Sequence, residues 1–180
     1  SPVSYSDGDV TRTLPPDGQS DPLGAQRGLA LQPLDNPSGF SFFTDSAKRS
    51  FGRGSYLVTL LGCNNCHTNP SLVGAKINTS AFLSGGRVFI TAAAMAPVVR
   101  TVRVMSANLT GQQRGLQMTA DQFVQTLINQ KHADEPSMRT LAAPMPSYKN
   151  LVDEDLQALY TYLIAVPRRT AAADKATQEY

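Results

Sequence analysis

The chain has 180 residues, of which 41% are hydrophobic and 17% are charged, and its formal net charge is +2. This length suits one domain with room for an extension, and such a chain can bury a core without disulfide staples. Its 13 glycines and 12 prolines interrupt it too often for a coiled coil. No apolar run reaches the roughly 18 residues that a transmembrane helix needs.

Charge is unevenly distributed along the chain. Residues 1–45 hold two basic and six acidic residues, a net charge of −4, and residues 121–180 hold six basic and eight acidic residues, a net charge of −2. Residues 46–120 hold eight basic residues and no acidic one. This positive block is either a solvated surface or a docking face for an acidic partner. Because the basic residues are scattered and no binding motif accompanies them, nucleic acid is a poor candidate.

The N-terminal residues 1–45 are predicted to form an irregular arm, since residues 1–40 contain six of the prolines and five of the glycines. A first helix is predicted over 46–61, where Gly52 and Gly54 weaken the helix propensity and indicate close packing of another backbone. Gly62 ends this helix directly before Cys63.

The remaining elements are predicted from local patterns. Residues 68–118 look mostly like loop, with a short strand around 98–105. A second helix over about 120–130 begins with a capping box formed by Thr119 and Gln122. The last helix runs over about 153–165 with an apolar stripe and an acidic first turn. Residues 168–180 are expected to be a polar tail.

One motif carries chemistry: the two cysteines of the chain, Cys63 and Cys66, are followed at once by His67. C-x-x-C-H is the attachment pattern of c-type haem. One turn of chain between the thiols lets them meet the two vinyl groups on one edge of a porphyrin. The next residue, the histidine, is then carried under the ring, where its imidazole can bind iron.

Three other interpretations of the motif are weaker. A redox dithiol would have the first cysteine opening a helix after a strand, whereas here a helix precedes it. A zinc site needs four ligands, and His132, the only other histidine, lies at a spacing that matches no common zinc pattern. A plain disulfide would leave His67 unexplained.

An electron-transfer haem needs a second axial ligand, and Met145 is the best candidate among five methionines. It lies between Pro144 and Pro146, in a rigid extended stretch that can present a side chain. Met105 and Met118 are interpreted as core residues, the usual role of methionine. His132 has charged neighbours, so a surface role is expected for it.

These residues make the sequence similar to class I cytochrome c, and closest to the cytochrome domains of bacterial periplasmic dehydrogenase complexes. The resemblance covers about 46–167, which is predicted as the cytochrome domain. The segments that carry it are Arg53–Val58 with Gly62–Thr68, Ala81–Gly86, Asn108–Thr110, Met118–Phe123, Pro144–Tyr148, Asp153–Leu156 and Tyr160–Leu163.

The resemblance implies an all-α fold in which the first and last helices cross, with Gly52 and Tyr56 against Tyr162 or Tyr160. It also implies that a proline carbonyl after the motif, here Pro70, orients the ligand imidazole through its ring N–H. The stretch from Gly86 to Asn108, rich in Ala and Val, departs from the family pattern. The residues assigned to binding one covalent haem c are Cys63, Cys66, His67, Met145, Pro70, Tyr148 and Asn108, with His67 and Met145 on the iron.

The function expected from these assignments is electron transfer rather than catalysis, either as a free carrier or as a cytochrome subunit of a larger redox complex. The positive block would dock an acidic redox partner, and the 1–45 arm could wrap a neighbouring subunit. The alternative is a haem enzyme or gas sensor with an open sixth iron position. Haem attachment in this family takes place outside the bacterial inner membrane, so a periplasmic location is expected. The start at Ser1 agrees with a removed leader, or the sequence has been trimmed.

Overall fold

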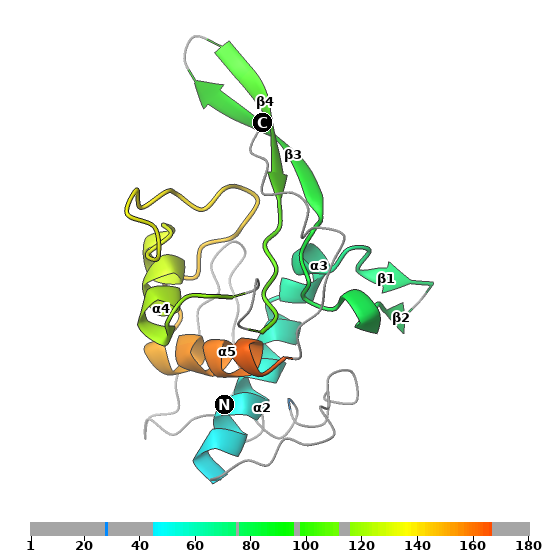
Figure 1. Ribbon diagram of the computed structural model, residues 1–180, viewed down its shortest axis with the longest axis vertical. Coiled ribbons are helices and arrows are strands. Elements are labelled where there is room, and N and C mark those ends of the chain that lie inside the picture. Colours follow the sequence, from blue (N-terminus) through cyan, green and yellow to red (C-terminus); the bar gives the residue numbers. More distant parts are fainter. Residues whose placement is uncertain (1–27, 29–44, 75, 96–97, 112–115, 167–180) are drawn as a thin grey trace.

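The computed structural model describes residues 28, 45–74, 76–95, 98–111 and 116–166 (Figure 1). The predicted arm, apart from Gly28 and Asp45, and the predicted tail at 168–180 therefore lie outside the described residues. The elements follow in the order α2 (Asp45–Leu60), α3 (Cys63–His67), β1 (Leu72–Val73), β2 (Lys76–Ile77), the 3-10 helix η2 (Thr79–Ala81), β3 (Val88–Met95), β4 (Val98–Met105), α4 (Ala120–Asn129) and α5 (Asp153–Ala165). No helix in this part of the chain is both long and apolar enough to span a bilayer.

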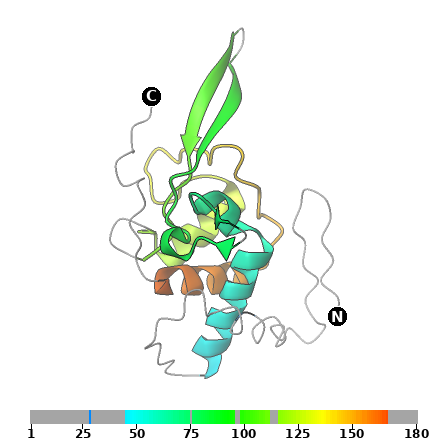
Figure 2. The same cartoon turned by 90° about the vertical axis from the view of Figure 1, so that its right-hand side faces the viewer.

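The helices α2 and α5 cross in direct contact, as Figures 1 and 2 show. Gly54 makes the contact possible, because a Cβ at this position would lie 2.0 Å from the carbonyl oxygen of Ala158 and 2.6 Å from Cβ of Tyr162. Phe51 adds a tilted ring contact with Tyr162, at 5.1 Å between centroids. The backbone of α2 thus lies directly on the backbone of α5.

The predicted partners at this crossing were partly wrong. Gly54, not Gly52, is the glycine against α5. The carbonyl of Gly52 instead faces Gly28, where an added Cβ would overlap it. Tyr56 lies beneath the guanidinium of Arg53, 5.7 Å from the ring centroid. Both glycines of α2 therefore have the close backbone neighbour that their low helix propensity indicated, on two different faces.

A buried ion pair ties the same two helices together. Arg53 donates from Nε to Oδ1 of Asp155 at 2.9 Å and from Nη2 to Oδ2 at 3.1 Å. The exposed fractions of the two side chains are 4% and 1%. This fork geometry satisfies both partners away from water. Arg53 consequently contributes nothing to the positive surface that the sequence pattern indicated.

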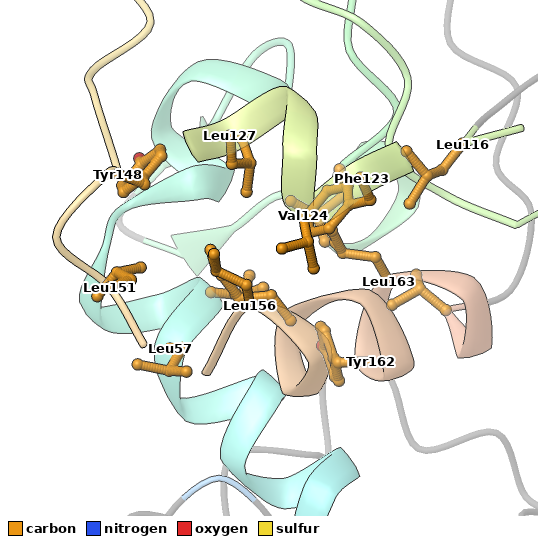
Figure 3. Close-up of a cluster of buried hydrophobic side chains, with 14 of the residues drawn as sticks. Leu57, Leu116, Phe123, Val124, Leu127, Tyr148, Leu151, Leu156, Tyr162 and Leu163 are labelled. Carbon is orange, nitrogen blue, oxygen red and sulfur yellow. The ribbon is translucent and has the colours of Figure 1, made fainter. Parts of the chain in front are cut away.

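The helix α4 packs against α5 and completes the core (Figure 3). Its capping box is formed as predicted, with Thr119 Oγ1 accepting from the amide of Gln122 and the Gln122 side chain accepting from the amide of Thr119. Phe123 contacts Tyr160 at 5.7 Å between ring centroids, and the Tyr160 hydroxyl donates to the carbonyl of Met118. The core side chains labelled in Figure 3 are Leu57, Leu116, Phe123, Val124, Leu127, Tyr148, Leu151, Leu156, Tyr162 and Leu163.

The all-α prediction was wrong in one respect, because the fold contains a long antiparallel hairpin. Its strands β3 and β4 pair continuously from Val88↔Met105 to Met95↔Val98. Figures 1 and 2 show the hairpin projecting away from the helices. The sequence predicted β4 within the atypical Ala- and Val-rich stretch but missed β3. A minor pair, β1 with β2, follows α3.

Substituting Gly54 tests the close approach of the helices. Gly54→Ala should lower the free energy of unfolding by about 1–3 kcal/mol, because the new methyl group meets backbone that cannot move aside. The control Lys48→Ala, at an exposed position on the same helix, should change it by no more than about 0.5 kcal/mol. Urea denaturation measures both, and a Gly54→Ala protein as stable as the wild type would refute the crossing.

A double-mutant cycle tests the buried ion pair. Asp155→Ala should cost about 3–5 kcal/mol of unfolding free energy, because it leaves a buried guanidinium without its carboxylate. The double variant Arg53→Ala with Asp155→Ala should cost less than the single changes Arg53→Ala and Asp155→Ala added together. The exposed pair of Arg139 and Glu135, at 3.0 Å, is the control and should show coupling of about 0–1 kcal/mol. Equal coupling in both pairs would contradict the burial of Arg53.

Candidate functional site

The C-x-x-C-H motif forms its own short helix, α3, directly after α2. Gly62 provides the turn between the helices, with a φ of 69° that a residue with a side chain rarely adopts, and its carbonyl accepts from the amide of Asn65 at 2.9 Å. Helical spacing places Cys63 and Cys66 on one face of α3. Both thiols are free and half-buried, so the pair is available for covalent chemistry.

His67 ends α3 with its side chain only 8% exposed. Its Nδ1 lies 2.8 Å from the carbonyl oxygen of Ala107. Since a carbonyl only accepts, Nδ1 carries the proton and Nε2 holds the lone pair. Burial lowers the pKa of His67, while the bond to Ala107 opposes the change. Among the described residues Nε2 has no hydrogen-bond partner, so the structure presents a neutral imidazole with a buried nitrogen free to bind.

The acceptor on this imidazole differs from the prediction. The carbonyl of Pro70 accepts instead from Nδ2 of Asn78 at 3.0 Å, and Ala107 takes the role that Pro70 was expected to fill. Ala107 lies just beyond the end of β4, at the base of the projecting hairpin. A backbone carbonyl carries no residue-type signal, so sequence reasoning had no means to find it.

Several hydrogen bonds hold the base of the β3–β4 hairpin against α3. The amide of Gly85 donates to the carbonyl of His67 at 2.7 Å, and Nη1 of Arg87 donates to the carbonyl of Asn65. Across the base, Gly86 and Arg87 exchange backbone hydrogen bonds with Ser106 at 2.9 Å. The position of the His67 acceptor is therefore set by the two ends of the hairpin.

Asn108 shapes the turn that follows Ala107. Its Oδ1 accepts from the amide of Thr110 at 2.9 Å and from the hydroxyl of Thr110 at 2.7 Å. Thr110 is fully buried. The amide of Leu109, which lies between Asn108 and Thr110, donates to the carbonyl of Leu83. In this structure Asn108 thus supports the strand end that carries the imidazole acceptor.

Tyr148 lies in the segment before α5, in the buried cluster against which Cys63 also packs. Its side chain is 5% exposed and lies in the core cluster (Figure 3). Burial raises the pKa of Tyr148, and the charges that Cys63 and Cys66 would carry raise it further. Burial likewise raises the pKa of Cys63 to about 12, with a smaller contribution from Cys66. The buried cluster thus contains Tyr148 and has both Cys63 and Met145 packed against it.

Met145 lies in the Pro144–Tyr148 loop and is half-buried against the core cluster. Its amide donates to the carbonyl of Ala142, and Gln130 at the end of α4 holds the loop by donating to the carbonyl of Pro146 at 3.3 Å. Met118 also packs on the cluster, but its sulfur accepts from the Thr126 hydroxyl at 3.6 Å. This contact agrees with the structural role expected of Met118.

His132 lies outside this group of residues. Its Nδ1 is 3.7 Å from carboxylate oxygens of both Asp134 and Glu135, and its side chain is 23% exposed. Within the described ranges, no cluster of three or more His, Cys, Asp and Glu side chains could hold a metal ion. The surface role expected for His132 agrees with this environment.

The donor set on α3 fits a covalently attached haem. Two thiols on one helical face can each form a thioether, and the buried Nε2 of His67 needs a partner that the described residues do not provide. The bond from Nδ1 to Ala107 fixes the tautomer and the ring orientation that an iron ligand requires.

The chain is similar to the fructose dehydrogenase cytochrome subunit of Gluconobacter japonicus, with 30% identity over 131 residues. The similarity covers 72% of this chain and 24% of that protein, so the chain spans about a quarter of the length of this curated relative. No protein-family model matches the chain, and no solved structure matches it.

Replacing Asn108 tests the turn that carries the acceptor. Asn108→Ala should lower the free energy of unfolding by about 1–3 kcal/mol, because the amide and hydroxyl of the buried Thr110 lose the bonds that Oδ1 of Asn108 accepts. The control Asn129→Ala removes an exposed side chain from α4 and should change it by no more than about 0.5 kcal/mol. Chemical denaturation compares the two variants. Equal small effects would mean that Asn108 does not hold this turn.

Proposed function

We propose that the chain is a cytochrome c domain that transfers electrons through one covalently attached haem, as part of a dehydrogenase complex. One observation carries the proposal: the C-x-x-C-H sequence forms a helix with two free thiols and a buried imidazole whose Nδ1 is already engaged by Ala107. The similarity to a dehydrogenase cytochrome subunit supports it at the level of the family.

Each residue has a distinct task in this proposal. Cys63 and Cys66 would hold the ring through two thioethers, and His67 would bind the iron through Nε2. Met145 would supply the second iron donor and would keep water and substrates from the iron. A bound haem supplies iron that cycles between two oxidation states, at a potential that His/Met ligation raises. The buried side chain of Tyr148 would help to exclude water from the ring.

The proposed setting is an assembly outside the inner membrane. The relative is named as a subunit of a dehydrogenase, and a domain that has both axial positions filled contributes electron transfer rather than catalysis. Bacterial class I cytochromes acquire their haem on the outer side of the inner membrane, so we propose a periplasmic location for the chain, in a respiratory electron-transfer path. The 1–45 arm is proposed to contact a neighbouring subunit, and the acidic redox partner expected from the charge pattern is the acceptor or donor.

Absorption spectra test the ligand set. The reduced wild type, produced in a host able to attach haem, should show sharp low-spin c-type bands that carbon monoxide does not change. Met145→Ala should bind carbon monoxide and become high-spin when oxidised, because it removes the second axial donor. The control Met138→Ala, at a position 45% exposed, should behave as the wild type does.

Two outcomes would contradict this assignment. A wild type whose spectrum shifts with carbon monoxide has an open or labile iron position, which favours the haem enzyme or gas sensor. A Met145→Ala protein with unchanged low-spin bands means that another side chain binds the iron.

A further inference from the structure

The β3–β4 hairpin stands apart from the rest of the fold. In the part of the chain that the structure describes, its strands pair with each other and with no other strand. Both ribbon views show it extending away from the helices (Figures 1 and 2). A two-stranded hairpin in water is marginally stable by itself. A hairpin of this length therefore gains from a surface that covers it.

The outer edge of β3 lacks the usual protection of an exposed strand. The pairing of the hairpin runs through eight consecutive residue pairs without a bulge. The strand sequence, Val88–Met95, contains no charged residue and no proline. Natural proteins place charges, prolines or bulges on free edges to prevent pairing with other chains. Their absence from β3 favours an edge that is paired in the assembled protein.

The hairpin combines apolar exposure with positive charge. Val88 is 43% exposed and Ile90 is 72% exposed. Arg103 lies opposite Ile90 in the register and is exposed. Arg87 precedes β3, Arg100 lies on β4, and the sequence from residue 46 to 120 contains no acidic residue. A complementary surface would be apolar at its centre and acidic around it.

A protein surface can form hydrogen bonds with the free backbone groups of this hairpin, whereas the interior of a lipid bilayer cannot. Inserted into lipid, a two-stranded ribbon would leave the backbone groups of both outer edges without hydrogen bonds, which costs several kcal/mol for each group. An extended segment of a protein supplies these bonds along β3. Pairing between the hairpins of two copies of this chain would bring their arginines together, and like charges repel.

We propose that the β3–β4 hairpin is a docking arm that receives, along the edge of β3, an extended segment of a partner protein flanked by aspartate and glutamate side chains. Backbone hydrogen bonds supply the affinity, and the arginines select the acidic partner. The inference goes beyond electron transfer and does not depend on the haem. It identifies which part of the positive block serves for docking.

Site-specific photo-crosslinking in the source organism tests whether the β3–β4 hairpin docks a partner protein. A benzophenone amino acid placed at Ile90 should form one major adduct with a different protein, through a peptide that contains aspartate or glutamate next to apolar residues. The same probe at Met138, an exposed site outside the hairpin, is the control and should not form this adduct. No adduct at Ile90, or an adduct with a second copy of this chain, would overturn the proposal.

A charge swap then separates specific docking from mere proximity. Arg103→Glu should reduce the yield of the Ile90 adduct by about tenfold or more, and replacing the acidic residues of the cross-linked peptide by lysine should restore it. Lys48→Glu, an exposed charge reversal on α2, should leave the yield unchanged. An adduct that is insensitive to Arg103→Glu would overturn the proposal.

Vesicles and spectra separate the remaining outcomes. Sedimentation of the protein with phosphatidylcholine–phosphatidylglycerol vesicles that is lost in Arg103→Glu would assign the hairpin to a membrane surface and overturn the protein partner. The haem spectrum of Arg103→Glu should equal that of the wild type, since the exposed Arg103 is not among the donors on α3. If no adduct forms but the haem spectrum is normal, the electron-transfer proposal stands and the docking proposal fails. If the adduct forms but no haem spectrum is seen, the docking proposal stands and the electron-transfer proposal fails.

Discussion

The close crossing of α2 and α5 at Gly54 positions the two segments that carry the candidate site. The helix α3, with both thiols and His67, follows directly from the end of α2. The loop that carries Met145 and Tyr148 leads into the start of α5. The two halves of the candidate site are therefore carried on two helices that touch backbone to backbone. The buried pair of Arg53 and Asp155 fixes the same contact against sliding.

The base of the β3–β4 hairpin holds His67, the candidate haem ligand. Ala107, which accepts from His67, lies just past β4, and Gly85, which donates to the carbonyl of His67, lies just before β3. The imidazole is thus held from both ends of the hairpin. If a partner docks on the hairpin, it does so on the element whose base holds this ligand. The fold therefore links the β3–β4 hairpin directly to the imidazole of His67.

The sequence predicted those features that depend on local patterns. The capping box of Thr119 and Gln122 and the limits of α5 each involve residues close together in the chain. The short helix that Cys63–His67 forms was not predicted. The strand β3 could not be predicted, because its Ala-rich sequence does not alternate and its pairing depends on β4. Gly54 could not be separated from Gly52 without knowing which face of α2 meets α5. Arg53 looked like a surface charge because Asp155, its partner, is distant in sequence.

The central claim is that this chain carries one haem on Cys63 and Cys66. Mass spectrometry under denaturing conditions tests it most directly, on protein produced in a host that attaches haem. The account predicts a single species that retains the mass of one haem after unfolding, and loss of that mass when both cysteines are replaced by alanine. A denatured wild type with the mass of the polypeptide alone would contradict the account.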